Sequence, residues 1–176
     1  MRDFEMVPYG KVDGIRTYRD SEIMELYRRA MAESGPQMFR DGGVKDEAGF
    51  LRMVKAQGVA FHVAYVRGKV AGCVWLNRFH DRLAQVHFFI FREFWGEDAT
   101  GLGRHCLREL IHKRCGDEGY WLDMLLGLTP ADNPLAVRFA KKCGWKQACV
   151  LPFGMYDAAA GASIPAVLSI VTREEV

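Results

Sequence analysis

The spacing of apolar residues changes character along the chain. Apolar positions first recur at helical spacing, so we predict helices over residues 21–32 and 45–56, separated by the breaker "SGP" at 34–36. The pattern then changes to runs rich in β-branched and aromatic residues. These runs predict strands at 59–66 and 70–76, joined by the tight turn "RGK".

The second half of the chain alternates between strands and helices. We predict a strand at 85–91, a helix at 102–115, a strand at 121–128, a helix at 134–143 and two strands at 146–151 and 163–172. The polar segment "NRFHDR" precedes the first of these strands. Asn133 and Pro134 are typical of a helix N-cap and first turn, and Gly144 is typical of a C-cap. A further strand is expected around Ile15 to Tyr18.

This order of elements predicts an α/β fold. We expect a single domain over residues 1–176, with a mixed, mostly antiparallel sheet of about six or seven strands flanked by about four helices. A chain of 176 residues that is 49% hydrophobic and 26% charged is long and apolar enough for a sizeable core.

Charge and cysteine usage exclude several classes of function. A net charge of +2, with scattered Lys and Arg, predicts no nucleic-acid or membrane partner. Five cysteines without a CxxC pair argue against a disulfide framework, and His105, His112 and Cys115 are too few for a zinc site, so we predict no metal. The opening "MRDFEMVPYG" lacks the apolar core of a signal peptide, and a cytoplasmic location is expected.

The stretch "FWGEDATGLGRHCL" at residues 94–107 carries the most specific chemistry. Gly101 and Gly103 lie between an aromatic run and a helical pattern, where backbone N–H groups and the helix dipole suit a phosphate. The same glycines also suit a turn that binds nothing. A Rossmann unit needs a third glycine and a P-loop needs Gly-Lys-Ser/Thr, and both are missing.

Residues 59–172 resemble the GNAT superfamily of acyl-CoA N-acyltransferases. The resemblance rests on the 59–76 hairpin, the strand "QVHFFIF", the turn "WGEDATGLG" before a helix, and "NPLAVRFAKKCGW", which is similar to the family's Asn-x-x-Ala-x-x-Phe…Gly-aromatic signature. It implies an enzyme, an N-acetyltransferase that moves an acetyl group from acetyl-CoA to a primary amine by direct attack on the thioester.

The resemblance also implies where CoA binds. The sheet of such proteins splays between the fourth and fifth strands, pantetheine pairs with strand backbone in the gap, and the pyrophosphate sits on the turn. Applied to this sequence, the resemblance implies that Ile90, Phe91 and Arg92 contact pantetheine and that Asn133 lies beside the thiol end of CoA. The turn and the first helical residues are Gly96, Glu97, Asp98, Ala99, Thr100, Gly101, Leu102, Gly103 and Arg104.

Two departures from the family pattern concern charge and proton transfer. Asp98 stands where the family has Arg or Gln, unless the alignment starts at Trp95-Gly96, and a carboxylate there repels a pyrophosphate. Arg92 and Arg104 are candidates to compensate. Ala140 replaces the tyrosine that protonates the departing thiolate in many members, and Tyr156 and Tyr120 are the alternatives.

Acyl transfer requires a neutral amine, so a base must accept a proton. His87 is the first candidate because it lies on the predicted strand at 85–91. When the alignment is counted back from Asp98, it falls where several members of the family that the chain resembles carry Glu or His, and in the alignment from Trp95-Gly96 this correspondence is lost. A buried histidine with satisfied nitrogens is the alternative interpretation. Glu93 is the second candidate base. No G-x-S-x-G or S-x-x-K motif supports a serine nucleophile.

Two other functions stay open at this point. One is a catalytically silent GNAT-fold module that binds acyl-CoA or a protein, and the other is a nucleotide or methyl-donor fold that reuses the glycine turn. The acceptor amine is unidentified, and its pocket is expected from residues 20–58 and 152–163. The apolar last strand, "AVLSIV", allows a homodimer.

Overall fold

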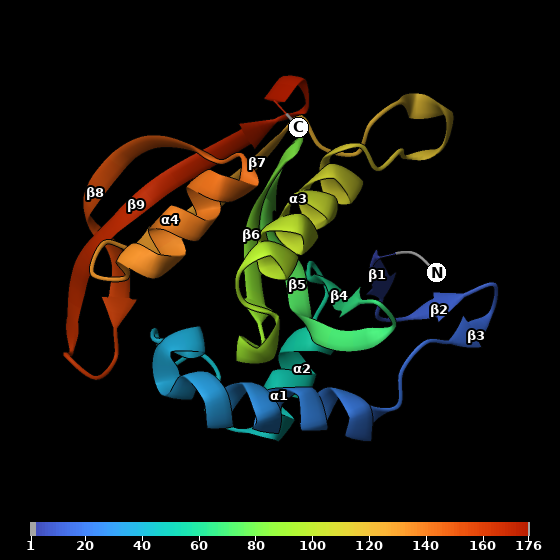
Figure 1. Cartoon of the computed structure of the whole chain (residues 1–176), viewed down its shortest axis with the longest axis horizontal. Coiled ribbons are helices and arrows are strands. Elements are labelled where there is room, and N and C mark those ends of the chain that lie inside the picture. Colours follow the sequence, from blue (N-terminus) through green and yellow to red (C-terminus); the bar gives the residue numbers. More distant parts are fainter. Residues whose placement is uncertain (1–2, 176) are drawn as a thin grey trace.

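A computed structural model describes residues 3–175 (Figure 1). One seven-stranded sheet has the order β1-β4-β5-β6-β7-β9-β8, and β2 and β3 form a separate hairpin. The strands are β1 Phe4–Pro8, β2 Lys11–Val12, β3 Ile15–Arg16, β4 Ala60–Val66, β5 Lys69–His80, β6 Leu83–Ile90, β7 Met124–Pro130, β8 Lys146–Asp157 and β9 Ala162–Thr172. The α-helices are α1 Asp20–Ser34, α2 Glu47–Lys55, α3 Glu97–Ile111 and α4 Pro134–Cys143, and the short 3-10 helices are η1 Gly35–Phe39, η2 Arg92–Phe94, η3 Gly116–Glu118 and η4 Arg173–Glu175.

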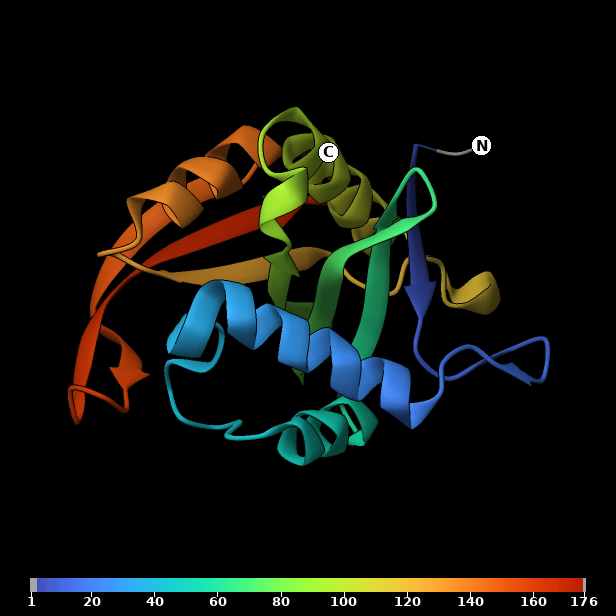
Figure 2. The same ribbon diagram turned by 60° about the horizontal axis from the view of Figure 1, so that its bottom comes forward.

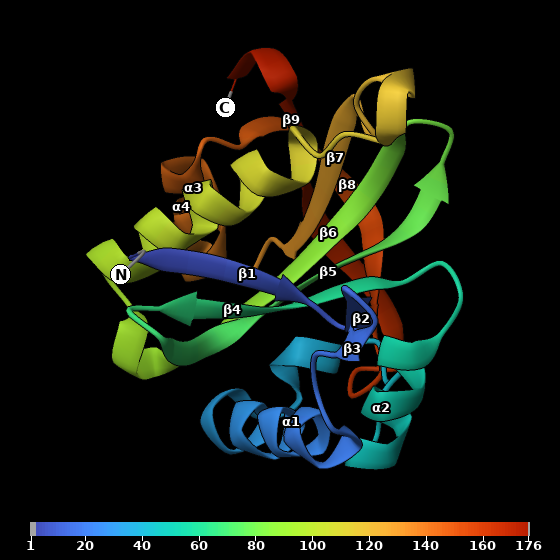
Figure 3. The same ribbon diagram turned by 90° about the vertical axis from the view of Figure 1, so that its right-hand side faces the viewer.

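Helices cover both faces of the sheet. Figures 2 and 3 show α1 and α2 on one face and α3 and α4 on the other. The first face is packed by aromatic rings, with Phe50 of α2 lying 5.4 Å from Tyr27 and 5.6 Å from Phe61 between ring centroids. The second face is covered by the apolar side of α3, whose buried residues are Ala99, Leu102, Cys106, Leu107, Leu110 and Ile111.

The predicted α/β class is confirmed, with a mostly antiparallel sheet and four α-helices. The helix α4 is confirmed in detail. Asn133 Oδ1 accepts a hydrogen bond from Ala136 N at 3.1 Å, and Gly144 closes the helix with a left-handed φ of 106°.

Two predicted elements have different boundaries in the structure, and one strand was missed. The segment read as a polar break continues β5 to His80, since Asn77 pairs with Gln85 of β6. α3 starts at Glu97 rather than at Leu102 and ends before Cys115. The strand Phe4–Pro8 had not been predicted; it pairs only with β4, so it is an edge strand with a weak apolar signal.

The sheet splays between β6 and β7. These are its one parallel pair in the described residues, and they pair only through Leu83–Gln85 and Met124–Leu126. Beyond that point β6 pairs with β5 alone, and residues 127–130 of β7 pair with β9 alone. The carboxyl ends of β6 and β7 therefore diverge, which leaves a gap between the two halves of the sheet.

Candidate functional site

The edge of β6 beside the gap offers backbone hydrogen-bonding groups. Phe91 N donates to Ala71 O at 2.8 Å on the β5 side. Because the polar groups of successive strand residues alternate between the two edges, those of Phe88 and Ile90 face the gap. One of them is already used, since Ile90 O accepts from Trp95 Nε1 at 2.9 Å. The remaining groups can pair with an extended ligand.

The three residues predicted to contact pantetheine differ in where their backbone N–H groups point. Only Ile90 directs its N–H into the gap. Phe91 N is bonded to β5, and Arg92 N donates to Glu33 Oε2 of α1 at 2.7 Å. Phe88, which sequence reasoning did not select, is better placed by the alternation than Phe91 or Arg92.

The N-terminus of α3 lies directly after this strand. Its N-cap is Gly96, with φ of 105° and no side-chain hydrogen bond at the cap within residues 3–175. The first turn contains Glu97, Asp98 and Ala99, whose backbone N–H groups precede the first helical bond, which is donated by Thr100 N to Gly96 O at 3.2 Å. An uncapped helix N-terminus of this kind suits an anion.

The two glycines of the motif lie inside α3 and face protein. A Cβ on Gly101 would lie 2.4 Å from Phe4 Cζ, and one on Gly103 would lie 2.5 Å from Cys143 Sγ. The side of each residue where a Cβ would lie therefore faces protein, and ligand contact by these two glycines stays a prediction. They are needed for the close packing of α3 against β1 and α4. Leu102 between them is buried in the core.

Asp98 is neutralised by a residue that sequence reasoning missed. Arg67 of the β4–β5 turn forms two hydrogen bonds with the carboxylate, at 2.9 and 2.6 Å. These bonds lower the pKa of Asp98. The two arginines predicted to compensate Asp98 make other contacts. Arg92 lies over the ring of Trp95, and Arg104 donates to Lys142 O at the end of α4.

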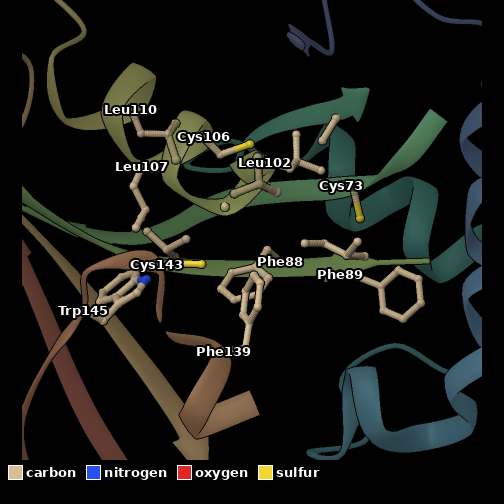
Figure 4. A pocket seen from close by; sticks show the side chains of 15 residues that line it. Cys73, Phe88, Phe89, Leu102, Cys106, Leu107, Leu110, Phe139, Cys143 and Trp145 are labelled. Carbon is tan, nitrogen blue, oxygen red and sulfur yellow. The ribbon is translucent and has the colours of Figure 1, made fainter. Parts of the chain in front are cut away.

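A narrow apolar cavity of about 20 Å³ lies at the gap, between β6, α3 and α4 (Figure 4). Its more exposed end is formed by Phe88, whose ring centroid lies 5.1 Å from that of Phe139. Trp145 lines it from the segment after α4 and is buried. The indole nitrogen of Trp145 has no hydrogen-bond partner in the described part of the chain.

Cys143 also lines this cavity. Burial raises the pKa of its thiol to about 12, although Arg104 acts in the opposite direction. The thiol donates weakly to Thr100 O at 3.9 Å. Cys143 is therefore a protonated packing residue, which agrees with the absence of a nucleophile motif in the sequence.

His87 lies on the α1–α2 face of β6. Its ring stacks on Trp75, with centroids 5.0 Å apart and an interplanar angle of 7°. His87 Nε2 lies 3.0 Å from Asn77 Oδ1. The amide oxygen is an acceptor, so Nε2 carries the hydrogen and Nδ1 keeps its lone pair. Burial and the charge of Arg78 lower the pKa of His87 to about 4 against the opposing effect of Asp41, and the ring is neutral.

Glu93 and His87 are not brought together. Glu93 is exposed in η2 and pairs with Arg29 of α1 at 2.9 Å. It lines a polar hollow with Arg67, Lys69 and Asp98 beside the N-terminus of α3. Because an arginine already holds this carboxylate, it is a weaker candidate for the base than His87.

Arg40 joins three segments on the far side of the gap. Its guanidinium donates to Asp157 at 2.7 Å and to both oxygens of Asp132 at 2.7 and 2.8 Å. Its carbonyl accepts from Ala158 N at 2.9 Å. The tip of the β8–β9 hairpin is thereby fixed against the segment after η1, and the two regions predicted to form the acceptor pocket are in contact.

Neither alternative tyrosine lies at the gap. Tyr120 lies near the end of α3, against His112 and Arg173. Tyr156 is 50% exposed, and it precedes Asp157, which faces Arg40, so the two side chains lie on opposite faces of β8. Ala140, at the family's tyrosine position, is buried in α4.

Sequence patterns that could have indicated the missed residues exist for Asn77 but not for Arg67 and Arg40. Asn77 could have been found from strand alternation two residues beyond Trp75. Arg67 and Arg40 had no local signal, since their partners lie 31 to 117 residues away. Among residues 3–175, no group of three or more His, Cys, Asp or Glu is placed to hold a metal ion. None of the helices in the described residues is long and apolar enough to cross a membrane.

Comparison with known proteins agrees with this geometry. A sequence model of the acetyltransferase (GNAT) family matches residues 21–145. A search of curated protein sequences found no significant match.

Several solved structures share the fold at low sequence identity. Spermidine N-acetyltransferase from Vibrio cholerae, in complex with CoA and spermine, has a TM-score of 0.73 and 12% identity, covering 98% of this chain and 97% of that one. An acetyltransferase from Salmonella typhimurium that modifies the N-terminal serine of ribosomal protein L7/L12 has a TM-score of 0.74 and 11% identity, covering 98% and 96%. The microcin C7 self-immunity acetyltransferase MccE, in complex with acetyl-CoA and AMP, has a TM-score of 0.68 and 17% identity, covering 87% and 86%.

Proposed function

The chain belongs to the acetyltransferase (GNAT) family, and from this we propose that it transfers an acetyl group from acetyl-CoA to a primary amine. The observation that carries the proposal is the alignment of two features. The unpaired edge of β6 at the gap leads directly to the uncapped N-terminus of α3. An extended amide-containing arm and a pyrophosphate need these two features in this order.

The chain's own residues fit this ligand. Phe88 and Ile90 offer backbone N–H groups to the arm, and the same N–H groups can polarise a thioester carbonyl. The first turn of α3 offers N–H groups to the pyrophosphate. Arg67 removes the repulsion expected from Asp98. Asn133 is held by its own capping bond near the end of β7.

His87 is our proposed base. Its Nδ1 lone pair accepts a proton from the attacking nitrogen, directly or through a water, as the nitrogen–carbon bond forms and the carbon–sulfur bond breaks. The electron pair of the broken bond leaves with the thiolate of CoA. A histidine with a pKa of about 4 is a weak base, so the amine must reach the site already neutral. Glu93 is the second candidate.

The acceptor is proposed only as a primary amine. Two of the similar solved proteins are a spermidine N-acetyltransferase and an enzyme that acetylates a protein N-terminus. Three carboxylates near the gap pair with arginine: Glu93 with Arg29, and Asp132 and Asp157 with Arg40. This pairing favours an acceptor with one ammonium group over a polyamine. A single domain over residues 1–176 and a homodimer are proposed on the sequence evidence alone.

The test is a panel of amines with acetyl-CoA, scored by release of free CoA thiol and by the mass of the acetylated product. The panel includes spermidine, simple monoamines and peptides with free N-termini. A product that depends on intact His87 supports the proposal.

A catalytically silent module is the second candidate, favoured by the buried Ala140 at the tyrosine position. Binding of CoA without acetylation of any amine in the panel supports it. Thermal unfolding with CoA measures binding independently, because ligand at a hundred times its dissociation constant adds about 2.7 kcal/mol. The midpoint should then rise by roughly 5–10 °C.

A further inference from the structure

The indole N–H of Trp145 is a buried donor without an acceptor. The side chain is 5% exposed, and its nitrogen has no hydrogen-bond partner in residues 3–175. Buried polar groups in native proteins are nearly always paired, so each exception needs an explanation. The indole ring packs against Gly127, but this packing does not use the N–H group.

The position of Trp145 relates this donor to the gap. Its ring packs against Gly127 of β7, where an added Cβ would lie 3.3 Å from the indole. It shares one cavity with Phe88 of β6 and with Phe139 and Cys143 of α4. Figure 4 shows the indole nitrogen on the edge of the ring directed toward Cys143 and the two phenylalanines. The donor therefore faces the space where β6 and β7 part.

The lining of the cavity leaves the indole N–H without an acceptor. The side chains around it are aliphatic, aromatic or thiol groups, and the Cys143 thiol is directed to Thr100 O. A trapped water needs two to four polar partners, which these side chains do not supply. No side chain of this cavity accepts the indole N–H, which leaves the donor available to a ligand group thin enough to enter an apolar slot.

We propose that the indole N–H of Trp145 donates a hydrogen bond to an amide carbonyl oxygen on the pantetheine arm of acyl-CoA. The inference rests on the proposed function. The Trp145 side chain would be one more donor to the pantetheine arm, on the side opposite to the backbone donors of β6. Phe88 and Phe139, in contact at 5.1 Å, close the more exposed end of the cavity and separate when the arm enters. Trp145 is thus a residue that binds and positions the donor substrate.

The experiment measures binding of two probes by calorimetry, to the whole chain and to its Trp145→Phe variant. CoA contains the pantetheine arm, whereas adenosine 3′,5′-bisphosphate has phosphates and adenine but no arm. We expect the variant to bind CoA about threefold to tenfold more weakly, the range of one hydrogen bond, and to bind the bisphosphate unchanged. Trp121→Phe is the matched control because Trp121 packs on Phe79, away from the cavity. It should change neither affinity.

Unfolding of the same variants separates binding from folding. Trp145→Phe removes an unsatisfied buried donor and also one of the two fused rings, so a gain and a packing loss oppose each other, and the variant should still unfold in one cooperative transition. Equal CoA affinity of the variant and the wild type overturns the inference and leaves the proposed function intact. Equal weakening of both probes also overturns it, since the effect then does not involve the arm. A folded wild type that does not bind CoA overturns the proposed function, and this inference with it.

Discussion

Arg40 and Asp157 are separated by 117 residues in the chain, yet their side chains are joined by a hydrogen bond of 2.7 Å. The same guanidinium holds Asp132 next to the N-cap of α4. Arg40 therefore links the segment after η1, the loop that begins α4 and the tip of the β8–β9 hairpin. The first and last of these segments belong to the regions predicted to form the acceptor pocket, and the Arg40 side chain helps to hold them together.

Replacing Arg40 by Gln should loosen the hairpin tip. The substitution leaves Asp132 and Asp157 without their cation, so it should lower the unfolding midpoint. It should also speed hydrogen exchange at Ala158 N, which donates to Arg40 O in the wild type. Arg82→Gln is the control, because Arg82 makes a similar pair with Asp123 elsewhere. Unchanged exchange at Ala158 would contradict the linking role.

The Arg40 pairs also predict a pH effect. Hydrogen bonds from Arg40 lower the pKa of both Asp132 and Asp157 in the folded state. Their contribution to stability is therefore present above the unfolded pKa of 3.8 and is lost as pH falls through the folded values. Below pH 4 the wild type should lose stability more steeply than Arg40→Gln.

His62, which is buried, and His87, which is half-buried, predict a loss of stability as the pH falls below 6.5. Burial lowers the pKa of His62 and of His87 to about 4, from 6.5. The unfolded chain binds protons below pH 6.5 while the folded chain does not, so stability should fall from pH 6.5 to pH 4. Each histidine contributes at most about 3 kcal/mol over this range. Urea unfolding at several pH values measures the slope.

His87→Gln should flatten this slope. A wild-type stability that is constant between pH 6.5 and pH 4.5 would mean that the two histidines are not kept neutral by the fold.

His87→Ala should lower kcat with little change in the Kd for CoA. General-base catalysis typically contributes 10²–10⁴-fold, and a weak base lies near the lower end, so we expect a loss of about a hundredfold. The pH profile of kcat/KM should show no inflection near 6.5, because the pKa of His87 lies near 4. His105→Ala, which alters a contact with Phe4, is the control. Equal losses of kcat and CoA binding would count against the role of His87.

Arg67→Gln should weaken CoA binding by a factor of about two to five, the range for an exposed ion pair. The cause is the uncompensated carboxylate of Asp98 at the N-terminus of α3. Adding Asp98→Asn should restore the affinity, and raised salt should reduce the difference between Arg67→Gln and the wild type. Failure of the second substitution to restore binding would show that Arg67 does not act through Asp98.

Local patterns predicted the elements better than the site. Asn133, Pro134 and Gly144 specify the ends of α4 by local rules, and the structure confirmed them. The gap depends on where β6 stops pairing with β7, and strand register between segments 40 residues apart has no local signal. The packing role of the motif glycines also had no local signal, since an added Cβ on them would meet Phe4 and Cys143, which are distant in the sequence.

The packing role of these glycines can be tested by comparing Gly103→Ala with Gly101→Ala. A methyl group on Gly103 meets Cys143 Sγ at 2.5 Å and Phe139 Cζ at 3.0 Å. Cys143 is short and fixed within α4, so α3 and α4 must separate. Overpacking costs about 1–3 kcal/mol, and replacing glycine in a helix returns about 1 kcal/mol. We therefore expect Gly103→Ala to lower the free energy of unfolding by up to about 2 kcal/mol.

Gly101→Ala meets only the far end of the Phe4 ring, which lies on a half-buried edge strand and can move. Its packing cost should be offset by the gain in helix propensity, and the variant should be within about 1 kcal/mol of the wild type. Cys143→Ala removes the sulfur that Gly103→Ala would meet, so the double variant should be more stable than the two single effects added together. Additive effects, measured by urea unfolding, would mean that Cys143 does not limit the space at Gly103. The glycine would then be free for another role, including the ligand contact that the sequence first indicated.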